Sequence, residues 1–142
     1  MRKFSAAVLL FWLLAPMDAA GKSPVEVTEL WTGSLFTSTY RVGLCFSSLG
    51  TIRGVVYLRL KNGKVDVYHI KGTVNGNKIK AFHSSGHKFK GELVGSDRVK
   101  GTITLKSGLR IELDGRREHN APLASEDCAP LASSEQPEKE RP

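Results

Sequence analysis

The sequence contains none of the short motifs that mark common enzyme mechanisms. Its 142 residues include no Gly-x-Ser-x-Gly nucleophile elbow, no His-Glu-x-x-His pair and no phosphate-binding glycine loop. The carboxylates are scattered along the chain, and most have a basic neighbour in the sequence. We therefore expect a protein that is not an enzyme, with a small enzyme on a barrel scaffold as the alternative class.

Long apolar runs are scarce, and the one that is present lies at the N-terminus. Two basic residues precede ten apolar ones, "AAVLLFWLLA", and Pro16 ends the run. This run is too short to span a bilayer core of ~30 Å, and the small residues Ala19 and Gly21 follow at the positions that a signal peptidase recognises. The pattern predicts a signal peptide over residues 1–21 and a periplasmic or secreted protein that is not integral to a membrane. An uncleaved membrane anchor is the alternative.

Cysteine is also rare, because Cys45 and Cys128 are the only two in the chain. His83 and His87 flank "SSG" and offer two metal ligands of unspecific spacing, whereas zinc sites need three or four. We expect no metal and no cofactor. In an exported protein the two cysteines favour a disulfide, and a link across 83 residues would stabilise the fold by up to roughly 4 kcal/mol. Two free thiols, or a bridge between molecules, are the alternatives.

Helical periodicity is absent after residue 21, and alternating strand patterns take its place. Turn dipeptides separate the runs, and two of them are Asn-Gly, the strongest short signal for a hairpin. Eight short strands joined by tight turns indicate an antiparallel up-and-down meander, which can close into a small barrel. We predict an all-β barrel domain over residues 22–116, closed or nearly closed, with an open sheet or a two-sheet sandwich as alternatives. The predicted strands are Thr28–Phe36, Tyr40–Ser47, Thr51–Leu60, Lys64–Val74, Asn77–His83, Lys88–Val94, Arg98–Lys106 and Leu109–Arg116.

One phrase recurs in five of these runs: an apolar residue, a glycine two positions later, and a second apolar residue two positions after that. It occurs as "WTGSL", "IRGVV", "IKGTV", "FKGEL" and "VKGTI", with Lys or Arg before the glycine in four of the five. Because side chains alternate between the two faces of a strand, each glycine shares a face with both apolar residues. We predict that the glycines face inward, where strands coil or where a bulky side chain from across the barrel needs room.

The two Asn-Gly turns also predict a register. If each forms a two-residue loop, Arg59 lies opposite Asp66, and both Val67 and Ile70 point into the barrel. Residues three apart cannot share one face of a regular strand. We therefore predict a β-bulge over Tyr68–Ile70.

After Arg116 the alternation ends and the composition changes. Residues 117–142 are rich in Pro, Ser, Ala and Glu, and contain "APLAS" twice, once on each side of Cys128. Such a segment cannot bury enough apolar surface to fold by itself. We expect an irregular, low-complexity C-terminal tail that Cys128 pins to the barrel and that is disordered beyond about residue 133.

Positive charge dominates the predicted barrel and negative charge dominates the tail. Residues 22–116 carry 16 Lys and Arg against 7 Asp and Glu, whereas residues 117–142 carry 3 against 6. We do not expect nucleic acid as the partner of an exported basic barrel; a basic patch instead predicts binding of anionic lipid, lipopolysaccharide, acidic polysaccharide or a protein. Lysines that only keep the sheet soluble are the alternative. The cations expected to form the patch lie on one hairpin: Lys88, Lys90, Arg98 and Lys100.

We therefore predict a non-catalytic exported binding module, which holds a partner on its basic outer face or a small ligand in its lumen. A spacious interior would favour the ligand, and an interior closed by bulky side chains would favour recognition at the surface. Strands this short predict only a small lumen. The bulky side chains expected inside are Trp31, Leu35, Phe46, Leu58 and Phe89.

A second candidate site is the loop Ser84–Phe89, "SSGHKF". Its Ser-Gly-His-Lys-Phe segment resembles the Ser-Gly-x-Lys/Arg-Tyr loop with which bacterial periplasmic inhibitors of C-type lysozyme enter the lysozyme cleft, with Phe89 in place of the tyrosine. Those inhibitors are small exported eight-stranded barrels. The resemblance covers five residues, and it implies a periplasmic inhibitor-like protein that binds an enzyme through this loop as the alternative function. The candidate residues at the tip of the loop are Ser85, Gly86 and His87.

Overall fold

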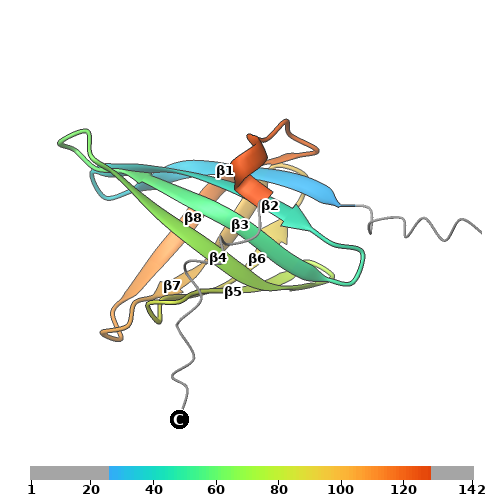
Figure 1. The fold of residues 1–142 in the computed structure, drawn as a ribbon. Helices are drawn as coiled ribbons and strands as arrows, with labels where there is room; N and C mark the ends of the chain where they lie inside the picture. The colour runs from blue at the N-terminus through green and yellow to red at the C-terminus, as the bar shows by residue number, and fades with distance from the viewer. Residues whose placement is uncertain (1–25, 129–142) are drawn as a thin grey trace, which may run out of the picture.

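The alternating runs form eight antiparallel strands that close into a meander barrel in a computed structural model, which describes residues 26–128 (Figure 1). Each strand pairs with the next one in the chain, and the last pairs with the first, so the predicted all-β barrel is confirmed. The predicted signal peptide, residues 1–21, and the tail beyond residue 128 lie outside the described residues. No helix within residues 26–128 is long and apolar enough to cross a membrane. The elements are β1 Val27–Leu35, β2 Ser38–Phe46, β3 Thr51–Arg59, β4 Val65–Asn75, β5 Lys78–His83, β6 Lys88–Val94, β7 Arg98–Thr104, β8 Arg110–His119 and the short 3-10 helix η1 Ser125–Cys128.

The glycines of the recurring phrase face the barrel interior, as predicted. Gly91 on β6 lies opposite Gly101 on β7, and a Cβ on either would overlap the ring of Phe89. On β1, a Cβ on Gly33 would overlap the ring of Tyr40. Bulky rings from the same or the adjacent strand therefore occupy the space beside Gly33, Gly91 and Gly101. At Gly54 and Gly72 a Cβ would instead overlap the carbonyl oxygens of Gly43 and Lys80 on the neighbouring strands, which fits the close approach of coiled strands.

The predicted β-bulge over Tyr68–Ile70 is wrong. β3 and β4 pair without interruption from Thr51 opposite Thr73 to Arg59 opposite Val65. The loop between these strands holds three residues rather than two, because the amide of Leu60 donates to the carbonyl of Lys64 at 2.8 Å. The extra loop residue shifts the register by one position. Val67 consequently faces solvent with 49% of its surface exposed, and no bulge is needed to point Ile70 inward.

The shifted register also removes the predicted pair of Arg59 and Asp66. Arg59 lies opposite Val65, and Asp66 instead binds the ammonium of Lys64 at 3.1 Å. The second Asn-Gly turn is displaced as well, because Asn75 pairs with Lys78 and the loop consists of the next two residues. Asn-Gly therefore marked where both turns occur but fixed neither the length of the first loop nor the exact position of the second.

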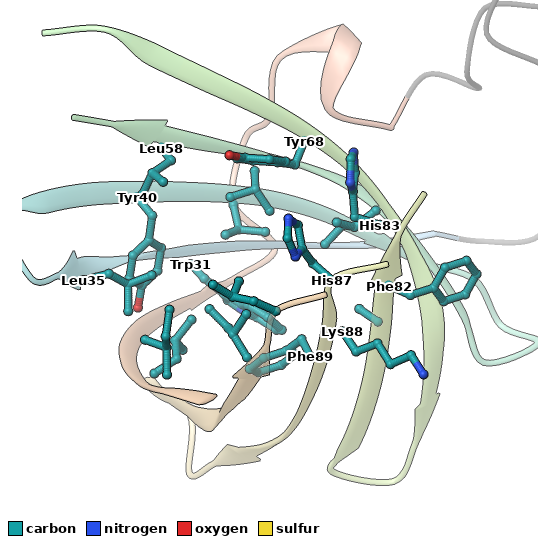
Figure 2. A pocket seen from close by; sticks show the side chains of 18 residues that line it. Trp31, Leu35, Tyr40, Leu58, Tyr68, Phe82, His83, His87, Lys88 and Phe89 are labelled. Atoms are coloured by element: carbon teal, nitrogen blue, oxygen red, sulfur yellow. The ribbon is translucent and has the colours of Figure 1, made fainter. Parts of the chain in front are cut away.

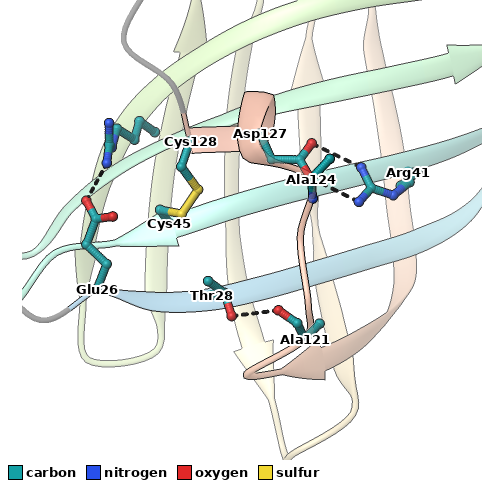
Figure 3. Close-up of a disulfide and its surroundings, with 9 residues drawn as sticks. Glu26, Thr28, Arg41, Cys45, Ala121, Ala124, Asp127 and Cys128 are labelled. Atoms are coloured by element: carbon teal, nitrogen blue, oxygen red, sulfur yellow. Dashed lines mark hydrogen bonds and ion pairs between the residues drawn. A yellow bond between two sulfur atoms is a disulfide. The ribbon is translucent and has the colours of Figure 1, made fainter.

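The chain after β8 folds back over the outer face of β2 and β3. The predicted disulfide between Cys45 and Cys128 is present, with the two Cα atoms 5.8 Å apart (Figure 3). It joins β2 to the end of η1, so the tail is pinned where expected, and it indicates an oxidising, exported location. β8 extends to His119, three residues beyond the predicted strand end at Arg116.

Asp127 fixes the returning segment to β2. Its buried carboxylate accepts hydrogen bonds from Nη1 and Nη2 of Arg41 at 3.1 and 3.0 Å, and from the amide of Ala124 at 2.9 Å (Figure 3). The carboxylate lies over Gly43, where a Cβ would overlap it. The outward face of Gly43 is therefore occupied by the tail rather than by solvent.

The two ends of the barrel differ. The loops β2–β3, β4–β5 and β6–β7 and the returning tail surround one end, whose interior is filled by apolar side chains. We call this the closed end. The loops β1–β2, β3–β4, β5–β6 and β7–β8 surround the other, which we call the open end; it faces left in Figure 1. The buried side chains that fill the closed end are Phe46, Ile52, Ile79 and Val99.

A buried ion pair completes the closed end. Glu29 on β1 is 0% exposed and accepts hydrogen bonds from Nε and Nη2 of Arg117 on β8, the shortest at 2.6 Å. Nδ1 of His119 lies 2.8 Å from the same carboxylate, and the indole of Trp31 donates to it at 3.3 Å. These contacts span the seam between β1 and β8, so a charged cluster helps to close the barrel.

Candidate ligand-binding cavity

The open half of the barrel encloses a cavity of about 210 Å³, whose walls are almost entirely apolar and aromatic (Figure 2). Four of the five bulky side chains predicted for the interior line this cavity, and only Phe46 belongs to the packed core instead. These side chains therefore surround a small lumen without filling it. The aliphatic residues of the wall are Leu35, Val42, Val56, Leu58, Ile70, Ala81, Ile103, Leu105, Ile111 and Leu113.

Two aromatic rings line the cavity and are held from outside it. Trp31 and Phe89 contact each other with ring centroids 5.9 Å apart and planes tilted by 57°. The indole N–H of Trp31 is bound by Glu29, and Phe89 lies on the paired glycines Gly91 and Gly101. The contacts that hold these two rings therefore come from the barrel wall and the closed end.

Tyr40 contributes the one buried side-chain polar atom that has no hydrogen-bond partner within residues 26–128. Its side chain lines the cavity, and its hydroxyl lies against Gly33 and Gly115. Burial, with a smaller contribution from Asp114, raises the pKa of the Tyr40 hydroxyl, which therefore stays protonated at neutral pH. A buried hydroxyl without a partner is costly, so the lumen wall contains a donor that the protein itself leaves unsatisfied.

Two histidines lie at the cavity rim. The rings of His83 and His87 are stacked with centroids 6.3 Å apart and planes 17° from parallel, and Tyr68 meets His83 edge-on at 5.3 Å (Figure 2). Nδ1 of His83 accepts from the amide of Ser85 at 3.2 Å, and Nδ1 of His87 accepts from the amide of Lys106 at 3.1 Å. Each neutral ring therefore carries its proton on Nε2, and the rim presents two N–H donors.

The neutral state of His83 is favoured by its surroundings. Burial lowers the pKa of its imidazole below the ordinary value of 6.5, and the neighbouring His87 and His69 lower it further. Within residues 26–128, no three His, Cys, Asp or Glu side chains gather in a way that could hold a metal ion.

The second candidate site, the loop Ser84–Phe89, joins β5 to β6 at the open end of the barrel. Gly86 takes the positive φ of 99° that the turn requires, and Ser85 is bound to the ring of His83. Phe89, at the position of the tyrosine in the resemblance, points into the barrel against Trp31. The loop positions the histidines of the rim, and binding of an enzyme through Ser85, Gly86 and His87 stays a prediction.

The four cations predicted to form a basic patch lie on neighbouring strands, with carboxylates interleaved. Nη2 of Arg98 binds both carboxylate oxygens of Asp114 at 2.6 Å, and this hydrogen bonding lowers the pKa of the Asp114 carboxyl. Lys100 pairs in register with Glu92 on one side and Asp114 on the other. The predicted surface therefore alternates in charge on β7 and β8.

The remaining two cations extend a lysine surface toward β5. Lys90 lies opposite Lys80, and Figure 2 shows the side chain of Lys88 pointing away from the cavity. In the described part of the chain, Lys80, Lys88 and Lys90 make no ion pair. This wall of the barrel is the part of the predicted patch that stays cationic.

Some residues of the site carried a sequence signal that we did not use. His83 follows Ile79 and Ala81 at alternate positions, so strand periodicity places it on the inner face, although the sequence suggested it only as a weak metal ligand. The same alternation places Glu29 inside with Trp31.

No protein family model, no curated protein and no solved structure matches this chain.

Proposed function

We propose that this protein is a non-catalytic, exported binding module that holds a small amphipathic molecule in its barrel. The observation that carries the proposal is the apolar cavity of about 210 Å³ at the open end. Concave, largely apolar sites with a few convergent polar groups are typical of small-molecule binding. Export to the periplasm or to the extracellular medium, by way of a signal peptide over residues 1–21, is part of the proposal.

The volume limits the apolar part of the ligand. A cavity of about 210 Å³ corresponds to roughly seven water molecules at ~30 Å³ each, and a methylene group is of similar size. One ring, or a chain of roughly seven or eight carbons, therefore fills the lumen. Any further part of the ligand would extend through the open end.

The rim favours a headgroup that accepts hydrogen bonds. His83 and His87 each present an Nε2–H donor beside the cavity. Lys106, whose amide binds His87, adds a cation to the same end. A carboxylate or another oxyanion headgroup matches these donors, whereas an ammonium headgroup would face them with more donors.

Calorimetric titration with straight-chain carboxylates of six to sixteen carbons tests the proposal. Each buried methylene contributes about 0.8 kcal/mol, so affinity should rise roughly fourfold per carbon until the lumen is full and then level off near roughly eight carbons. Alkylammonium ions of equal length should bind more weakly. Absence of saturable binding for every chain length, or affinity independent of chain length, would contradict the proposal.

Variants whose larger side chains fill the lumen provide a second test of the proposal. Ala81→Phe adds a ring to an inward position of β5, and Ile111→Trp does so on β8, where less of the surrounding core has to adjust. Both should abolish binding of octanoate. Thr73→Phe places the same ring on an exposed outward position of β4 and should leave affinity unchanged. Equal affinity in all three variants would show that octanoate does not enter the barrel.

A further inference from the structure

Two large apolar side chains stand exposed on loops around the cavity opening. Phe36, in the β1–β2 loop, is 86% exposed, and Leu109, between β7 and β8, is 59% exposed. Phe36 also has a φ of 55°, a conformation that disfavours bulky side chains. Neither core packing nor backbone conformation therefore accounts for a phenylalanine at this position.

The charged side chains of the open end are predominantly positive. Residues 36–37, 59–66, 84–88 and 105–110, which form its loops and the adjoining strand ends, contain six cations and one carboxylate, Asp66. That carboxylate is already bound to Lys64. The six cations are Arg59, Lys61, Lys64, Lys88, Lys106 and Arg110.

The closed end has no such excess of positive charge. Residues 26–29, 46–51, 75–78, 94–98 and 116–119 contain four carboxylates and four cations, and the carboxylates of Glu126 and Asp127 lie on the wall over β2 and β3. The difference between the ends gives the molecule a charge asymmetry along the barrel axis. A negatively charged surface would therefore attract the open end more strongly than the closed end.

We infer that the open end docks on an anionic phospholipid bilayer, with Phe36 and Leu109 entering the interfacial layer and the loop cations contacting the headgroups. An anionic bilayer has an apolar layer beneath negatively charged headgroups. The apolar side chains and the cations of the open end match these two layers. A soluble acidic polymer would use the cations but would leave both apolar tips in water. The tips lie on separate loops around the opening and do not form one continuous patch, which suits a deformable bilayer better than a fixed protein surface.

Docking in this orientation would place the cavity opening against the membrane. An amphipathic molecule could then pass between the bilayer and the lumen while its apolar part stays out of water. Phe36, Lys61 and Leu109 belong to the docking surface and do not line the cavity, so variants at these positions measure docking separately from ligand binding.

Co-sedimentation with vesicles tests the docking. The full exported chain should bind vesicles of phosphatidylglycerol and phosphatidylcholine and should bind pure phosphatidylcholine much more weakly. Phe36→Ser and Leu109→Ser should each weaken binding at least roughly tenfold, because each removes a large side chain from the apolar layer. Lys61→Gln and Lys106→Gln should each weaken it roughly fivefold, the equivalent of about 1 kcal/mol per cation near an anionic surface.

Two sets of matched variants serve as controls. Leu49→Ser removes an equally prominent side chain, 83% exposed, from the closed end and should have no effect. Lys80→Gln and Lys90→Gln remove unpaired cations from the barrel wall and should also have little effect. Equal binding to neutral and anionic vesicles, or a larger loss from the control variants than from the open-end variants, would overturn the inference.

Titration of the same variants with octanoate, without vesicles, separates docking from ligand binding. Phe36→Ser and Lys61→Gln, which change residues that do not line the cavity, should retain the octanoate affinity of the original chain while losing vesicle binding. Vesicle binding in a protein that takes up no alkyl carboxylate would overturn the proposed function and support docking. Octanoate uptake without any vesicle binding would overturn docking and leave the proposed function standing.

Discussion

The ring of Tyr40 lies directly against the backbone of Gly33, so that a Cβ at position 33 would overlap the phenol oxygen and two ring carbons. The same hydroxyl approaches Gly115 on β8. Both glycines are next to the short seam where β1 pairs with β8 and closes the barrel. A ring that lines the cavity is therefore seated on two strands at the point of closure.

Gly33→Ala should destabilise the protein by about 1–3 kcal/mol, because the methyl group forces the Tyr40 ring out of its position. In a Tyr40→Leu background the same substitution should cost much less, since only Tyr40 atoms are among the nearest neighbours of the added Cβ. Urea unfolding of the four proteins of this double-mutant cycle measures the coupling. Additive effects of the two substitutions would show that the contact is not the reason for glycine.

Local patterns were sufficient to predict the architecture. Alternation along each run located the eight strands and placed Gly33, Gly91 and Gly101 inside. The face of the sheet on which a side chain lies depends only on the residue's position in its own strand. The disulfide followed from the presence of only two cysteines in a chain expected to be exported. Neither prediction required knowledge of a distant partner.

The features that the sequence did not predict correctly depend on turn length or on partners distant in the chain. A glycine with a φ of 85° at position 63 suits a two-residue or a three-residue loop, so the dipeptide does not define the register. One extra residue then turns Val67 outward. Likewise, the buried Glu29 is stabilised by Arg117, 88 residues away, and no local pattern identifies that pairing.

Glu29→Ala should lower the free energy of unfolding by about 3–5 kcal/mol, because it leaves the guanidinium of Arg117 in a largely buried site without its partner. Asp66→Ala removes a carboxylate from an exposed pair with Lys64 and should change stability by about 0–1 kcal/mol. Chemical unfolding of both variants compares the two pairs. Similar losses in the two variants would mean that the cluster at the closed end does not stabilise barrel closure.

Replacing both Cys45 and Cys128 by alanine should leave the barrel folded and reduce its stability by up to about 4 kcal/mol, because the link restricts the unfolded chain across 83 residues. The contact between Arg41 and Asp127 would still hold the returning segment on β2. Unfolding in the presence and absence of reductant should differ for the original protein and coincide for the variant. Equal midpoints for the original protein under both conditions would contradict a stabilising role.

Stability should fall as the pH drops below the ordinary histidine range, and His83 should account for part of the fall. Burial first, and then the neighbouring His87 and His69, lower the pKa of His83 below the ordinary value of 6.5 that it regains on unfolding. Between the two values the unfolded chain binds more protons than the folded one, so the free energy of unfolding rises with pH across that window and this contribution is constant above it. His83→Gln should flatten the profile between the lowered value and 6.5. Parallel profiles for the two proteins would show that the rim does not hold His83 in its neutral form.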